Sequence, residues 1–210
     1  MIRKFNIIIF IILLSISKAH SLIEIDITRG NLDPLPIAVS PLFQDDMSKK
    51  NSINELKIEN IGSQISTVVE NNLKTSGLFN PLSNEAFLQK PDIAHLKPRF
   101  EDWALIKAQA LITGKVIIDN KKLKVEFRLW DILAGREMMA LAFTTVPSNW
   151  RRVGHIISDK VYERLTGEKG YFDTRIIYVS EEGPKIERVK KLAIMDQDGF
   201  NTKYLTLGNE

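Results

Sequence analysis

Few side chains in this sequence have the types and spacing that acid–base or metal chemistry requires. The chain has no cysteine and three histidines, so disulfides, thiolate zinc sites and thiol nucleophiles are excluded. His95 lies in a proline-flanked stretch, and His155 lies beside the apolar stripe of an expected helix, where we expect a packing or capping role. A catalytic base also needs an orienting partner and a nucleophile nearby, and the sequence holds no G-x-S-x-G, H-E-x-x-H or glycine-rich phosphate motif. We therefore expect no enzyme activity, no catalytic residue and no cofactor.

The run Asp196-Gln197-Asp198-Gly199 could be taken for the start of a calcium-binding loop. In such a loop the glycine comes later, and here it stands two residues too early, while Phe200 occupies a ligand position. An Asp-Gly pair between two strands is a strong hairpin signal. We expect a turn at this point and no metal site.

Basic side chains gather in two small groups, Lys121-Lys122-Lys124 and Arg151-Arg152. Both groups have acidic neighbours and lie on faces expected to be solvated, whereas nucleic-acid recognition needs a clustered basic patch. Measured retention on heparin would separate the two readings, because phosphate binding weakens steeply with salt. We expect no nucleic-acid partner.

The N-terminus has the three features of an export signal. Arg3 and Lys4 precede an apolar run from Phe5 to Ile16, and the small residues Ala19-His20-Ser21 follow. We expect cleavage after Ser21, with Ala19 as the alternative. The run of about twelve residues is shorter than the ~20 that span a bilayer, which disfavours an uncleaved anchor. Residues 1–21 are thus interpreted as a signal peptide, and the exported chain as soluble, peripheral to membranes and monomeric.

Removing this leader changes the charge balance. Three of the 29 basic side chains, including Lys18, lie in the leader, which leaves 26 basic and 26 acidic side chains in the remainder. The excess positive charge of the full sequence is therefore no argument for an acidic partner.

Strands, a helix, a three-stranded meander and a second helix then follow in an order typical of an α+β domain. Period-two alternation predicts a strand over Leu22–Thr28, with Ile23, Ile25 and Ile27 on one face. Two prolines in Asp33–Pro36 are expected to interrupt regular pairing before a short strand at Ile37–Val39. We expect a surface loop over Gln44–Asn54.

A helix of about twenty residues ending at Ser76 is predicted by its apolar stripe and by the following Gly77. An irregular stretch and a short helical turn lead to an antiparallel meander over about 109–118, 122–130 and 136–145. Ser148 is expected to cap a last helix that ends at Thr166-Gly167. The pattern predicts an α+β fold: a mixed β-sheet with helices packed on one face.

Beyond Gly170 three short strands at about 175–180, 191–195 and 203–207 are separated by turn sequences. They predict most of a four-stranded antiparallel blade. A lone meander of this length is only marginally stable, so we interpret it as the start of a repeat array, an incomplete β-propeller blade.

Several stretches together resemble the TolB family of envelope proteins. They are IEIDITRGNLDPLPIAV, SGLFNPL, VEFRLWD, HIISDKVYERLTGEKGYFDTRIIYVS and DQDGFNTKYLT. The resemblance implies a TolB-like N-terminal domain over 22–168 and the start of a propeller over 169–210. It also implies a periplasmic, non-catalytic adaptor of the Tol–Pal system that serves envelope integrity and outer-membrane constriction during division.

The same resemblance implies two partners, a TolA-like inner-membrane protein and a Pal-like outer-membrane lipoprotein. The Pal-binding surface would lie largely outside this sequence. The TolA-type segment would comprise Leu22, Ile23, Glu24, Ile25, Asp26, Ile27, Thr28, Arg29, Gly30, Asn31, Leu32 and Asp33. By pattern alone this segment is an ordinary edge strand. Two other readings of the chain remain, a stand-alone exported ligand-binding α+β domain and a non-functional gene remnant.

Overall fold

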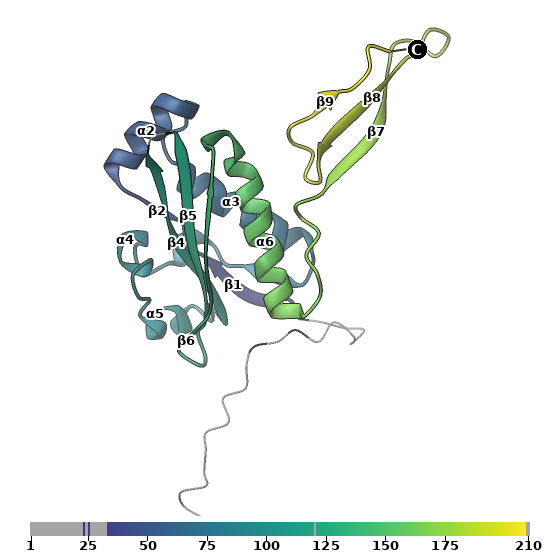
Figure 1. Ribbon diagram of the computed structural model, residues 1–210. Helices are drawn as coiled ribbons and strands as arrows, with labels where there is room; N and C mark the ends of the chain where they lie inside the picture. The colour runs from purple at the N-terminus through teal and green to yellow at the C-terminus, as the bar shows by residue number, and fades with distance from the viewer. Residues whose placement is uncertain (1–22, 24, 26–32, 120, 209–210) are drawn as a thin grey trace, which may run out of the picture.

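A mixed six-stranded sheet with helices packed against it forms the main body, and a three-stranded antiparallel sheet extends from it (Figure 1). The computed structural model describes residues 23, 25, 33–119 and 121–208. The strands are β1 Leu35–Val39, β2 Phe43–Gln44, β3 Phe79–Pro81, β4 Ala110–Asp119, β5 Lys122–Asp131, β6 Arg136–Thr145, β7 Arg175–Glu182, β8 Val189–Asp196 and β9 Lys203–Tyr204. The α-helices are α2 Asp46–Leu56, α3 Ile61–Thr75, α4 Pro91–Ala94, α5 Phe100–Leu105 and α6 Trp150–Thr166, with 3₁₀ turns η1 Asn84–Ala86 and η2 Pro147–Asn149. Within these described ranges, no helix has the length and apolar character needed to cross a bilayer.

The large sheet has the order β3-β1-β4-β5-β6, and β2 also pairs with β4. The pairs that involve β1 and β2 are parallel, whereas β4, β5 and β6 form an antiparallel meander. The meander predicted from alternating side chains is confirmed, and its ladder is regular except for a shift at Leu129/Trp130. The small sheet pairs β7 with β8 and β8 with β9, both antiparallel. The α+β class is confirmed.

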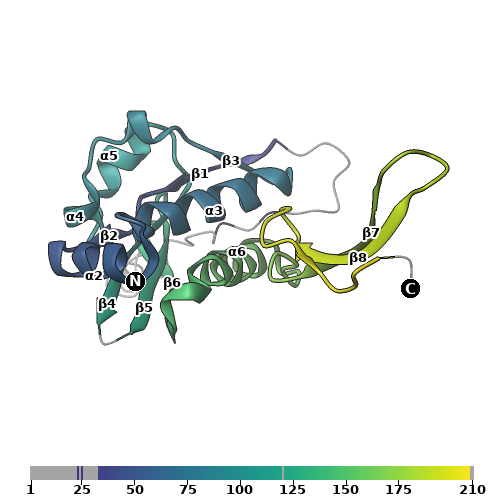
Figure 2. The same ribbon diagram turned by 90° about the horizontal axis from the view of Figure 1, so that it is seen from above.

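The main core lies between the large sheet and the paired helices α3 and α6 (Figures 1 and 2). Both predicted apolar stripes are buried there: Ile61, Ile65, Val69 and Leu73 from α3, and Val153, Ile157, Val161 and Leu165 from α6. Gly154 lets the helices approach closely, because a Cβ there would lie 2.9 Å from Val68 Cγ1. The ends of both helices are as predicted, with Gly77 at φ +76° and Gly167 at φ +75°.

The opposite face of the sheet carries a smaller core, partly covered by the short helices α4 and α5. It comprises Ala38, Ala94, Trp103, Ala108, Leu111, Trp130 and Ile132. The two buried indole N–H groups are both satisfied: Trp103 donates to Gln89 Oε1 at 3.0 Å, and Trp130 donates to Thr113 Oγ1 at 2.9 Å. The predicted helices α3 and α6 cover one face of the sheet, and the short helices α4 and α5 cover part of the other face.

The prediction of a surface loop over Gln44–Asn54 is wrong, because this stretch forms the end of β2 and most of α2. Asp45 begins the helix by accepting a hydrogen bond from the Ser48 N–H at 2.7 Å, which lowers the pKa of Asp45. The helix buries small polar side chains rather than apolar ones. Ser48 receives the Ile118 N–H, and Ser52 donates to the Ile58 carbonyl. A search for apolar periodicity misses such a face.

Two local predictions at proline and serine also need correction. The expected interruption at the prolines does not occur, since β1 begins at Leu35 and includes Pro36. Pro36 has no N–H to donate, but its carbonyl accepts the Gln109 N–H at 3.0 Å and so still contributes a hydrogen bond to the sheet. Ser148 does not cap α6: the helix follows η2, and the N-cap position is Asn149, without a side-chain capping bond.

Replacing Gly114 with alanine is expected to lower the free energy of unfolding by about 3 kcal/mol, at the upper end of overpacking costs. A Cβ at this position of β4 would lie 2.1 Å from the Glu126 carbonyl oxygen and 2.9 Å from Phe127 Cα, so the β4–β5 backbones would have to separate. Urea unfolding measures the change. The exposed Thr144→Ala on β6 is the control and should stay within about 0.5 kcal/mol of the parent; an equal effect of the two would show that Gly114 is not sterically required.

Candidate functional site

Three residues of the predicted partner-binding segment are described by the structure: Ile23, Ile25 and Asp33. The other nine residues of the segment lie outside the described residues, as do the leader and its cleavage site at Ser21. Ile23 and Ile25 are half-buried and pack against the main core, and neither is in a strand. The isoleucine face predicted from the alternation is thus directed at this chain's own core at these two positions.

Among the described residues of the segment, one backbone hydrogen bond supports this contact. The Ile25 N–H donates to the Leu165 carbonyl at 2.7 Å. Leu165 lies in the last turn of α6, where the final four carbonyls of a helix have no partner within the helix. Ile25 therefore satisfies an acceptor that the helix end leaves open. A backbone group of another strand could replace it with the same geometry.

A second group of polar contacts lies toward the opposite end of α6 and reaches the turn after β8. Arg151 forms an ion pair with Asp198, and its guanidinium carbon lies 3.6 Å from the centre of the Phe200 ring. Gln197 Nε2 donates to Asn72 Oδ1 of α3 at 3.0 Å. We call the contacts of Asn72, Arg151 and His155 with Gln197, Asp198 and Phe200 the joint. It connects the small sheet to α3 and α6.

Asn72 and His155 form the interior of the joint and are each 2% exposed. The Ser158 hydroxyl donates to the Gly154 carbonyl, so its oxygen is free to accept from Asn72 Nδ2 at 2.9 Å. The same amide nitrogen faces His155 Nδ1 at 3.0 Å. Because Asn72 Nδ2 is the donor, His155 Nδ1 must accept, and the neutral ring carries its proton on Nε2. That Nε2–H has no hydrogen-bond acceptor among the described atoms and lies 3.7 Å from an Asp198 oxygen.

The groups around His155 disfavour a metal ion at this position. His155, Asp196 and Asp198 each offer an atom within 4.8 Å of the others. However, the carboxylates already have cationic or amide partners: Arg151 on Asp198, and Arg175 and Asn201 on Asp196. A metal would also require a lone pair on His155 Nε2, which carries the proton in this arrangement. The residues fit an ion-pair network, and we assign no metal to them.

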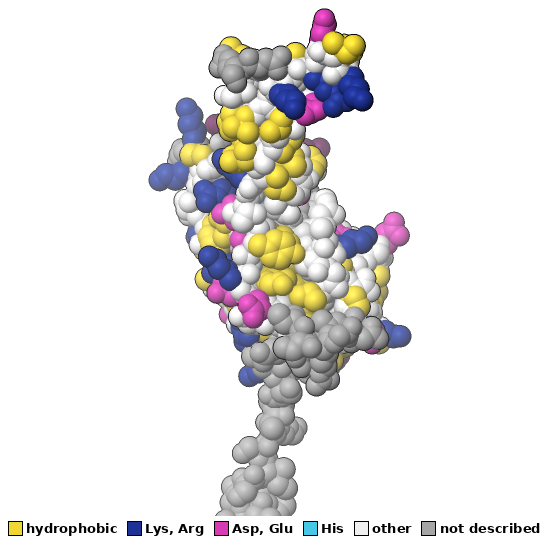
Figure 3. All heavy atoms as spheres, turned by 90° about the vertical axis from the view of Figure 1, so that its right-hand side faces the viewer, with side chains coloured by type: hydrophobic (Ala, Val, Ile, Leu, Met, Phe, Trp, Pro, Cys, Tyr) yellow, Lys and Arg dark blue, Asp and Glu magenta, His cyan; other side chains and the backbone are white. Residues whose placement is uncertain are grey.

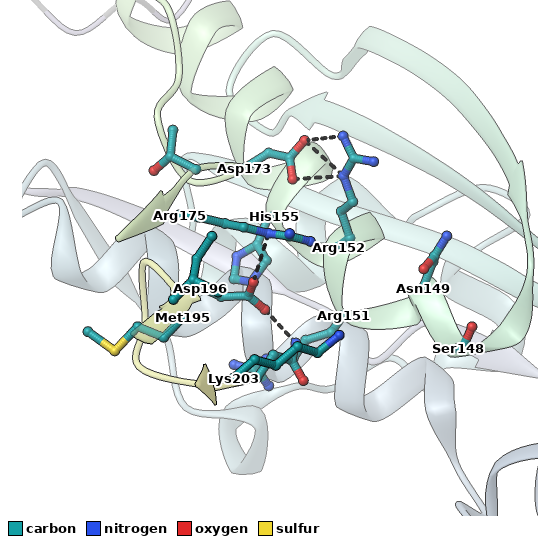
Figure 4. A pocket seen from close by; sticks show the side chains of 13 residues that line it. Ser148, Asn149, Arg151, Arg152, His155, Asp173, Arg175, Met195, Asp196 and Lys203 are labelled. Atoms are coloured by element: carbon teal, nitrogen blue, oxygen red, sulfur yellow. Dashed lines mark hydrogen bonds and ion pairs between the residues drawn. The ribbon is translucent and has the colours of Figure 1, made fainter. Parts of the chain in front are cut away.

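Two cavities flank the joint. The first, of about 600 Å³, is lined by Ser148, Asn149, Arg151, Arg152, His155, Asp173, Thr174, Arg175, Ile194, Met195, Asp196, Asn201 and Lys203 (Figure 4). Arg152 and Asp173 form a two-pronged pair at its edge, with N–O distances of 3.0–3.2 Å. The second, of about 470 Å³, lies on the α3 side and is lined mainly by amide and hydroxyl side chains, together with Val68, Arg151, Asp198 and Phe200. Both carboxylates in the lining of the first cavity have an arginine partner there, Arg152 for Asp173 and Arg175 for Asp196.

Burial is the main influence on His155, and it lowers the pKa of the imidazole below its ordinary value. Asp198, Asp196 and Asp173 act in the opposite direction, and Arg151 adds to the lowering. The ring is therefore neutral at neutral pH. The packing role expected for His155 fits its burial, but sequence reasoning missed Asn72 and Gln197, because single amides within a helix and a turn carry no motif.

The turn predicted at Asp196–Gly199 is confirmed. The Gly199 N–H donates to the Asp196 carbonyl at 2.9 Å, the Asp196 N–H donates to the Phe200 carbonyl at 2.8 Å, and Gly199 has φ +86°. The small sheet also leaves apolar side chains exposed, which gather in the upper part of Figure 3. They include Ile176, Ile177, Val179, Leu192, Tyr204, Leu205 and Leu207.

Comparison with known proteins gives consistent matches. A family model described as the TolB amino-terminal domain matches residues 23–138. The chain is 74% identical over 210 residues to the Tol-Pal system protein TolB of Pelagibacter ubique, a match that covers 100% of this chain and 47% of that relative. The chain thus spans about half the length of the curated relative it matches.

One solved structure is similar over most of the chain. The crystal structure of TolB from Acinetobacter baumannii aligns with a TM-score of 0.66 at 23% identity, and the match covers 83% of this chain and 39% of that one. At this level of identity the likeness concerns the fold alone, and it agrees with the architecture described above.

Proposed function

Because the chain belongs to the TolB family, we propose that it is a periplasmic, non-catalytic adaptor of a Tol–Pal system. It is exported by the leader over 1–21, which is removed after Ser21. Residues 22–168 form the N-terminal domain, and residues 169–210 begin a β-propeller. In this role the protein links a TolA-like inner-membrane protein to a Pal-like outer-membrane lipoprotein, and so serves envelope integrity and outer-membrane constriction at division.

The observation that carries the proposal is the Ile25–Leu165 hydrogen bond. The segment Leu22–Asp33 contacts this domain through a backbone group, together with two half-buried isoleucines. A chain of alternating side chains can also add to the edge of a partner's sheet, where backbone hydrogen bonds give affinity and alternate side chains give specificity. The N–H that binds Leu165 is one of the groups such a strand would offer to the partner.

Docking on the domain and binding to the partner therefore exclude each other at Ile25. A partner that binds only the released segment shifts the equilibrium toward the released state. This is possible when the docked and released states differ in free energy by only a few kcal/mol. The described part of the segment contributes one backbone hydrogen bond, about 1 kcal/mol net, and two half-buried isoleucines, and its docking is therefore of the order that a partner can displace. We expect the partner to bind at the N-terminal segment. We expect no enzyme activity from this protein.

Capture on an immobilised C-terminal domain of a TolA-like protein tests the proposal. The chain without residues 1–21 is expected to be retained, and bare resin should not retain it. A stand-alone exported ligand-binding domain would pass through unretained, which would contradict the adaptor function.

A further inference from the structure

We propose that the joint is a pH-sensitive contact: protonation of His155 releases the turn after β8 from α3 and α6. The inference does not depend on the partner-binding role of the N-terminal segment. It rests on the place of His155, which is buried at the contact between the helices and the small sheet. The ring contacts α3 through Nδ1 and faces the turn of the small sheet through Nε2.

The hydrogen-bond directions among the described atoms leave no acceptor for a second proton on the ring. Protonation would place an N–H at Nδ1, directly against the amide N–H of Asn72 at 3.0 Å. Asn72 can relieve this conflict only by turning its amide, which directs its NH₂ group toward Gln197 Nε2. Gln197 now donates to Asn72 Oδ1 at 3.0 Å, so that bond is lost unless Gln197 turns as well. Protonation of His155 therefore weakens the contact between α3 and the small sheet.

The charges around the ring come from several elements and partly cancel. Arg151 on α6 opposes protonation, whereas Asp173 before β7 and Asp196 and Asp198 around the end of β8 favour it. The side facing α3 supplies the uncharged Asn72. Burial exceeds these influences and holds the pKa of His155 below its ordinary value of about 6.5.

The direction of the pH effect follows from that lowered pKa. The ring binds a proton more readily when the joint is open and the ring hydrated than when the joint is closed. The closed joint is therefore fully stabilised above about pH 6.5 and loses stability as the pH falls through the lowered pKa. With one proton involved, the ratio of open to closed molecules rises at most about tenfold per pH unit in this window.

A pair of labels across the joint measures this opening. The natural sequence has no cysteine, so cysteines introduced at Lys74 on α3 and at Lys185, between β7 and β8, are the only attachment points. We expect a single separation at pH 8 and a growing population at other separations as the pH falls toward 5. A second pair within the main body, Lys74 with Thr144, should keep its separation throughout and so excludes global unfolding.

Two histidine variants assign the effect. In His155→Gln the separation between the labels is expected not to change with pH. In His95→Gln, a substitution in the α4 region, the separation should change with pH as it does in the parent. The proton resonances of the His155 ring report its protonation in the parent without any substitution at that position. Opening that persists in His155→Gln would overturn the proposal. Protonation of the ring in the parent with no change in separation would also overturn it, even if the His155→Gln variant failed to fold.

Discussion

Deleting Leu22–Asp33 from the mature chain is expected to reduce capture by the TolA-like domain to the level of bare resin, while the α+β domain stays folded. The segment supplies the strand that the partner's sheet would extend, and no second copy of that alternating pattern lies near it. The cost to the domain should be small, because the described residues of the segment hold to it through one backbone hydrogen bond and two half-buried isoleucines. Capture and urea unfolding are measured on the same samples.

A matched pair of variants separates the two faces of the segment. Changing Ile23, Ile25 and Ile27 to threonine keeps β-branched side chains but removes the apolar face, and should weaken capture strongly. Changing Glu24 and Asp26 to threonine alters the other face and should weaken it less. Capture of the deleted chain at the parental level would show that the partner binds elsewhere.

Replacing Arg151 with methionine is expected to detach the small sheet at a cost of about 2–3 kcal/mol. Breaking a fully buried pair costs about 3–5 kcal/mol, and this pair is mostly buried, with side chains 14% and 20% exposed. Asp198 would lose its charge partner, and Phe200 would lose the guanidinium over its ring. Limited proteolysis of β7–β9 measures the detachment, and urea unfolding of the main body should change little.

The neighbouring arginine is the control for Arg151. Arg152 pairs with Asp173, but its side chain is 62% exposed, so Arg152→Met should cost less than about 1 kcal/mol. Adding Asp198→Leu to Arg151→Met removes the unpaired charge and should restore part of the protection. Equal protease sensitivity of the two single arginine variants would show that burial of the Arg151 pair does not hold the sheet.

Strong periodicity explains which parts of the fold could be predicted from the sequence. The alternation in β5 and the stripes of α3 and α6 are set by apolar burial, and the glycines after both helices need a left-handed backbone. The helix α2 could not be predicted from apolar periodicity, because it packs through the polar side chains Ser48 and Ser52. The partner of Ser48 is Ile118, which is 70 positions away in the sequence. The joint could not be predicted for the same reason: Asn72 and Gln197 are 125 positions apart.

The partner-binding segment is proposed from its pattern and family resemblance, and the structure adds the acceptor at the end of α6. Nothing in the sequence indicates that the Leu165 carbonyl would receive the Ile25 N–H, because this pairing needs the last turn of α6 to lie beside the N-terminal segment. The alternation alone could not distinguish an edge strand from a segment that docks through single contacts.

The most direct test of the docked and released states is a distance between the segment and the end of α6, measured with and without the partner. Cysteines introduced at Glu24 and at Glu168, just after α6, carry the labels in a chain that otherwise has none. We expect a short separation in the free protein and its replacement by a longer one when the TolA-like domain is saturating. A separation that stays short while the partner is bound would contradict release of the segment on binding.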